Sequence, residues 1–104
     1  MLASEAAADR PPGYVGTWAS SPVQCLLDQG VTGAPLIMKV ARYDQHEAHC
    51  TFASVRRTGG NAWRVDARCR VEGGSQRHAF TIAVDGHAMT LRDKAGARTF
   101  IRCP

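Results

Sequence analysis

The sequence predicts a mainly β domain, in which a small antiparallel meander of seven strands closes into an up-and-down barrel or a strongly curled sheet. One short helix near the N-terminus and two disulfides complete the prediction. Three observations support it: apolar and polar residues alternate along several segments, turn-forming residues recur at strand-like intervals, and four cysteines are spread along 104 residues. A composition of 44% hydrophobic and 21% charged residues is typical of a globular protein, although so short a chain buries only a small core.

The N-terminal part of the chain predicts a tail and then the helix. Residues 1–13 lack periodicity and end in Pro-Pro-Gly, which favours a flexible tail and linker ahead of a single domain over 14–104. A helix of about two turns is expected over 22–29, because Ser21 can cap it and a proline follows at the first helical position. Gly30 supplies the stop signal.

Strands alternate with turn signals along the rest of the sequence. Double glycines and an Asp-Gly pair, the strongest short hairpin signal, separate segments in which every second residue is apolar. The seven strands are expected over residues 14–19, 36–43, 47–57, 62–72, 76–84, 87–92 and 97–103, with a turn at Asp44-Gln45 between the second and the third.

Folding three hairpins at their turns places one apolar set on one face of the sheet. The turns are expected at Gly59-Gly60, Gly73-Gly74 and Asp85-Gly86, and a slip of one residue in any hairpin would move that set to the solvent face. Agreement among three turns is itself evidence for the fold. The expected pairs are Cys50 with Cys69, Phe52 with Ala67, Ser54 with Val65, Phe80 with Ala67, Ile82 with Val65, Val84 with Trp63, Leu91 with Phe80 and Met89 with Ile82.

The cysteines predict two disulfides. The register puts Cys50 opposite Cys69 at a separation that a disulfide can bridge, which leaves Cys25 to pair with Cys103. The second bridge would tie the helix to the last strand and, by closing about 80 residues, would stabilise the fold by roughly 4 kcal/mol. Four cysteines allow three connectivities, and four buried thiols in a reducing compartment are the alternative.

Cysteine usage and the N-terminal residues predict a secreted or periplasmic protein. No stretch is long and apolar enough to cross a membrane as a helix, and a signal-peptide core is absent from this sequence. Ala6-Ala7-Ala8 nevertheless has the small residues of a cleavage site. An ordinary flexible tail is the alternative interpretation of this segment.

A short motif in the first strand supports the barrel. Gly16-Thr17-Trp18 resembles the opening of lipocalin- and avidin-like barrels and of the small periplasmic inhibitors of metalloproteases that share this barrel. Cys25, which follows this motif, also resembles an early cysteine of the inhibitors, but the short-range disulfide of that family is not evident here. The resemblance covers three residues and assigns the chain to no family.

The sequence offers little support for catalysis. His46–His49 reads His-Glu-Ala-His, in which the histidines are three apart at the start of a strand and point to opposite faces, so no metal site or cofactor is expected. Nucleophile-elbow, P-loop and dinucleotide motifs are absent, and the carboxylates form no recognisable pair. We therefore expect a non-enzyme, with a small hydrolase or metal-dependent protein as the third hypothesis.

Four residues are candidates for ligand binding at the ends of the barrel. The predicted register places His78 opposite Cys69 and both histidines of this set on the inner face, although a satisfied polar residue at the rim is the alternative. The candidates are Tyr14, Trp18, His78 and His87.

The outer face carries a second candidate site, made of cations. The net charge of +4 mildly favours acidic partners, and arginine forks suit carboxylate, sulfate or phosphate. The alternative is a solvated face that keeps the sheet soluble. The register places His49, Arg70 and Arg77 in one row, and the candidates for anion or partner binding are His49, Arg64, Arg68, Arg70 and Arg77.

These observations predict an exported, non-catalytic binding module. It would hold a small ligand in the barrel mouth or block another protein as an inhibitor does. The alternative is an envelope interaction protein that docks an acidic partner through the arginine-rich face. The expected partner classes are an acidic protein, an anionic polysaccharide or a small apolar ligand, and no specific nucleic acid.

Overall fold

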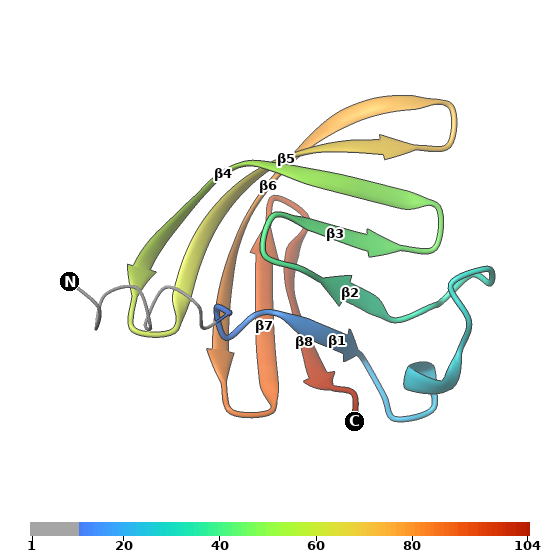
Figure 1. Ribbon diagram of the computed structural model, residues 1–104, viewed down its shortest axis with the longest axis horizontal. Coiled ribbons are helices and arrows are strands. Elements are labelled where there is room, and N and C mark those ends of the chain that lie inside the picture. The colour runs from blue at the N-terminus through green and yellow to red at the C-terminus, as the bar shows by residue number, and fades with distance from the viewer. Residues whose placement is uncertain (1–10) are drawn as a thin grey trace.

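The computed structural model describes residues 11–104, which form a closed antiparallel barrel (Figure 1). Each strand pairs with the next in sequence, and β1 pairs with β8 to close the barrel. The predicted up-and-down barrel is confirmed, with eight strands instead of seven. Residues 1–10 of the expected tail, including Ala6-Ala7-Ala8, lie outside the described residues. The elements are β1 (Gly16–Ala19), η1 (Gln24–Leu26), β2 (Leu36–Met38), β3 (Arg42–Gln45), β4 (Ala48–Gly59), β5 (Ala62–Val71), β6 (Gly74–Asp85), β7 (Ala88–Asp93) and β8 (Gly96–Arg102).

The extra strand arises because the segment expected as one strand over 36–43 forms both β2 and β3. The chain reverses between them, and the Lys39 N–H donates to the Arg42 carbonyl at 2.8 Å. The following turn, expected at Asp44-Gln45, lies at His46 and the residue after it, where His46 adopts a left-handed φ of 53°. Neither turn contains glycine or proline, so nothing marked the first turn and the second was expected two residues too early.

The helix expected over 22–29 is wrong in length, because only the single 3₁₀ turn η1 forms. The Ser21 hydroxyl accepts the Gln24 N–H at 3.4 Å, but Val23 occupies the N-cap position of η1 in place of the expected Ser21. The chain then becomes extended at Leu27, and the Gly30 N–H donates to the Asp28 carboxylate at 3.1 Å. So short a helix lacks the cooperativity to persist without packing, and Leu26 of η1 and Leu27 after it are both exposed.

The register between β4 and β5 follows the prediction over half of its length. The turn lies one residue later than expected, at Gly60-Asn61. Two irregularities in β4, between Arg57 and Gly59 and between Phe52 and Ser54, then restore the expected register from Phe52 back to His49. Cys50 pairs with Cys69 and Phe52 with Ala67, as expected, whereas Ser54 pairs with Asp66 instead of Val65.

The next two hairpins turn one residue away from the predicted positions. Their turns lie at Glu72-Gly73 and Gly86-His87, where Gly73 and Gly86 take φ values of 86° and 61° that favour glycine. Every pair in these hairpins is therefore shifted by two residues, which leaves the inward face unchanged. The observed pairs include Val65 with Phe80, Trp63 with Ile82, Ile82 with Leu91 and Val84 with Met89.

The barrel interior is filled by apolar side chains. Trp18 is fully buried, donates its indole N–H to the Tyr14 carbonyl at 2.8 Å and lies under the Arg102 guanidinium, 4.3 Å from the ring centroid. Trp63 and Phe80 lie on the same side of the sheet, as expected. The remaining core includes Leu36, Met38, Val65, Ile82, Met89, Leu91 and Phe100.

Both predicted disulfides are confirmed. Cys50–Cys69 lies in the core between β4 and β5, and Cys25–Cys103 joins η1 to the residue after β8. Two disulfides in a short chain are typical of an oxidising compartment outside the cytoplasm. Within residues 11–104 we find no helix of sufficient length and hydrophobicity to cross a membrane.

Candidate functional site

The interior of the barrel has little room for a ligand. The cavity that opens beside Tyr43 and His78 has a volume of about 50 Å³, whereas pockets for drug-sized ligands typically measure about 300–1,000 Å³. Such a cavity holds a few water molecules at most. This cavity alone could not hold a drug-sized ligand, and the binding of a small ligand in the barrel mouth stays a prediction.

A chain of polar side chains closes this end of the barrel. The Tyr43 hydroxyl of β3 lies 2.8 Å from Nδ1 of His78 on β6, and Nε2 of the same histidine lies 2.8 Å from Oδ2 of Asp93 at the end of β7. Arg98 of β8 donates to this carboxylate oxygen at 3.2 Å, and the Ala95 N–H donates to the other oxygen at 2.9 Å. Four strands thus contribute to one hydrogen-bonded network.

The electrostatics of this network indicate a structural role. The hydrogen bond from His78 is the main cause that holds the pKa of Asp93 below its ordinary value, and burial raises the pKa of Tyr43 to about 12. Because the Asp93 carboxylate accepts from Nε2 of His78, Nδ1 of the neutral ring is free to accept the Tyr43 proton. A tyrosine with so high a pKa stays protonated near neutral pH and is a poor nucleophile.

The structure does not bring the four predicted ligand-binding residues together. Tyr14 and Trp18 are core residues, and the Tyr14 hydroxyl donates to the Val40 carbonyl at 2.7 Å. His87 is exposed in the β6–β7 turn, so its predicted place on the inner face is wrong. His78 does lie on the inner face, but Ala67 is its neighbour on β5 instead of Cys69, because the hairpin is shifted by two residues.

The outer face of β3–β6 contains most of the predicted cation site, but the cations have different cross-strand neighbours from those expected. His49 pairs with Arg70 as expected, whereas Arg77 pairs with Arg68, so the predicted row of three is wrong. Acidic residues lie close to several of these cations. Arg77 lies 3.7 Å from the Asp66 carboxylate, Asp44 accepts from both His49 and Arg42 at 2.6 Å, and Glu47 and Glu72 flank Arg70.

A second group of cations crosses the same face nearer the β4–β5 turn. Arg56 of β4 pairs with Arg64 of β5, Arg64 pairs with Thr81 of β6, and Thr81 pairs with Arg92 of β7. Lys94 follows two residues later and lines the same surface. We call Arg56, Arg64, Arg92 and Lys94 the basic row.

Unlike Arg42, His49 and Arg77 of the same face, and like Arg68 and Arg70, the four cations of the basic row have no acidic partner among the described residues. Within residues 11–104, no carboxylate oxygen lies within 4.0 Å of a charged nitrogen of these four side chains. Sequence reasoning found Arg64 but missed Arg56, Arg92 and Lys94. The correct hairpin register would have revealed the two arginines, because they align with Arg64 only after the shifts described above.

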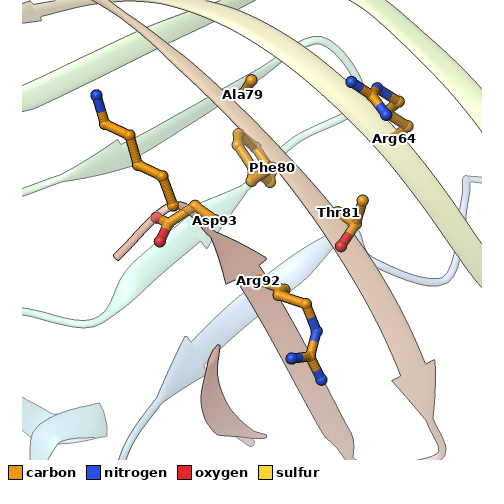
Figure 2. A pocket seen from close by; sticks show the side chains of 7 residues that line it. Arg64, Ala79, Phe80, Thr81, Arg92 and Asp93 are labelled. Atoms are coloured by element: carbon orange, nitrogen blue, oxygen red, sulfur yellow. The ribbon is translucent and has the colours of Figure 1, made fainter. Parts of the chain in front are cut away.

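A depression of about 270 Å³ lies within the basic row (Figure 2). Figure 2 shows Arg64 and Arg92 on opposite sides of β6, with Ala79 and Thr81 between them. A second hollow of about 270 Å³, lined by Ser54, Arg56, Arg64 and Asp66, continues toward β4.

Comparisons with protein families, curated proteins and solved structures found no match to this chain. The resemblance of Gly16-Thr17-Trp18 to lipocalin-like and inhibitor barrels therefore stays one of three residues, and the argument for function rests on the geometry of the chain itself.

Proposed function

We propose that this chain is a non-catalytic binding protein of the periplasm or the extracellular space, which docks an acidic partner through the outer face of β4–β7. Its two disulfides suit an oxidising compartment, and its packed interior leaves the surface as the working part. The basic row would be the centre of the contact.

The observation that carries this proposal is the like-charged pair of Arg56 and Arg64. They lie directly opposite each other on neighbouring strands, an arrangement that destabilises a sheet, and no acid of the described residues pairs with either. Arg77 and Arg42 on the same face do have acids within 4.0 Å. An anionic partner would relieve the repulsion on binding, and arginine forks suit its oxygens.

The test is retention on an immobilised sulfated polysaccharide, heparin, measured as the salt concentration needed for elution. The variant Arg56→Glu/Arg64→Glu/Arg92→Glu should elute at much lower salt than the unmodified chain. The matched control Arg42→Glu/Arg68→Glu/Arg77→Glu makes the same change in net charge on the same face and should retain most of the binding. Equal losses in both variants would show that net charge alone governs retention, and the proposal would be wrong.

One surface supports the inhibitor-like alternative. The loop around η1 exposes Val23 and Leu26, at 71% and 86% of their surface, and the Cys25–Cys103 disulfide tethers it. Exposed apolar residues on a tethered loop favour contact with another protein. If this loop were the working part, a Leu26→Ser variant would lose its partner while heparin retention stayed unchanged.

A further inference from the structure

We infer that the depression among Arg64, Arg92 and Lys94 binds one tetrahedral oxyanion, a sulfate or phosphate monoester carried by a polysaccharide. This inference rests on the proposed function, and it identifies the chemical group that the basic row recognises and the kind of molecule that carries it.

The geometry of the depression suits a compact anion. Arg64 on β5 and Arg92 on β7 are separated by one strand, so their backbones stand about 10 Å apart. The floor between them is formed by the small residues Ala79 and Thr81 of β6 (Figure 2), which leave room for both guanidinium groups to turn inward. The Thr81 hydroxyl can donate a hydrogen bond from this floor.

The charge in the depression is also favourable. Three cations line it, and the single carboxylate, Asp93, is already engaged by His78, Arg98 and the Ala95 N–H at distances between 2.8 and 3.2 Å. The other nearby acid of this face, Asp66, interacts with Ser54 and Arg77. The cations therefore exceed the acid by two charges, which suits a group that carries one or two negative charges.

The number and direction of the donors favour sulfate or phosphate over a carboxylate. One arginine fork is enough to engage both oxygens of a carboxylate. Two forks on opposite sides, a lysine and a hydroxyl below present more donors than two oxygens can use, but they match the three free oxygens of a monoester.

The surroundings favour a polysaccharide over a protein. The centre of a protein interface is enriched in aromatic residues, methionine and arginine, and depleted in lysine, serine and alanine. The residues that line the two hollows include Ser54, Ala79 and Lys94, and their one aromatic residue, Phe80, belongs to the buried core. A chain of sugars with charged substituents fits such an open surface rimmed by cations.

The experiment is an NMR titration of the full chain with inorganic sulfate and, separately, inorganic phosphate at constant ionic strength. Saturable amide shifts should concentrate at Thr81, Arg92 and Lys94. Arg64→Gln and Arg92→Gln should each weaken binding at least fivefold, while the control Arg70→Gln, on the same strand as Arg64, should leave it within twofold. Shifts that spread over all arginines without saturation would indicate an adventitious ion only and would overturn the inference.

Polysaccharide binding separates the two proposals. The inference expects Arg64→Gln and Arg92→Gln to weaken binding to a sulfated or a phosphorylated glycan, and the glycan that loses more identifies the natural group. Glycan binding that is unchanged in both variants would overturn the inference and leave the proposed docking face intact. Saturable sulfate or phosphate binding in a chain that binds no polyanion would support the oxyanion site but refute both the polysaccharide carrier and the proposed docking function.

Discussion

The inner and outer faces of the barrel treat their polar and charged groups in opposite ways. On the inner face, Tyr43, His78, Asp93 and Arg98 form one hydrogen-bonded chain, and among the described residues no buried side-chain nitrogen or oxygen lacks a partner. On the outer face, the basic row sets arginine beside arginine without an acid. The inner face satisfies its own groups as a stable core must, whereas the outer row finds no acid among the described residues, which is why we propose an anionic partner.

The largest expected loss of stability comes from a substitution in the buried core. Trp18→Ala removes a fully buried ring together with its hydrogen bond to the Tyr14 carbonyl, and should lower the free energy of unfolding by about 3–5 kcal/mol. Urea denaturation followed by circular dichroism measures it. A loss below about 1 kcal/mol would contradict the packing of this core.

The next effect breaks the polar network inside the barrel. Tyr43→Phe keeps the ring but removes the hydroxyl that is hydrogen-bonded to Nδ1 of His78, so it should cost about 1–3 kcal/mol of stability. The same urea experiment checks it, and heparin retention should not change. Reduced retention would mean that the inner network also shapes the outer binding face.

A smaller effect concerns acid stability. The pKa of Asp93 is lowered in the folded chain, chiefly by the hydrogen bond from His78, so this carboxylate stabilises the fold above its unfolded pKa of about 3.9. The contribution is lost as the pH falls below about 4. Asp93→Asn should therefore lower stability at pH 7 and reduce the difference in stability between pH 7 and pH 3. Thermal unfolding at both pH values measures it, and an unchanged difference would contradict the argument.

The smallest expected effect is a gain of stability on removing a charge from the outer face, which is the opposite of the loss expected on the inner face. Arg56→Ala removes one member of the like-charged pair and should raise stability by a few tenths of a kcal/mol at low salt, with the gain disappearing at high salt. Arg42→Ala, which loses its ion pair with Asp44 and lies opposite Thr51, is the matched control and should bring no gain. Destabilisation by Arg56→Ala would show that the basic row supports the fold instead of a partner.

Sequence periodicity predicted the parts of the molecule that depend on which face a residue occupies. The alternation of Trp63, Val65, Ala67 and Cys69 identified the inner face of β5, and hairpin folding identified the Cys50–Cys69 bridge. The split of β2 from β3 was not predictable, because neither glycine nor proline marks the turn. The short helix was overestimated because local capping signals do not report whether packing will support them.

By itself, then, the sequence determined the barrel class, the buried set and both disulfides, because side chains alternate with a period of two and burial selects one face. Only the tertiary structure decided which residues stand next to each other across strands. A shift of two residues in a hairpin leaves the faces unchanged, so periodicity cannot detect it, yet that shift moves Arg77 beside Arg68 and aligns Arg64 with Arg92. The Tyr43–His78–Asp93–Arg98 chain depends in the same way on strands far apart in sequence that closure of the barrel brings together.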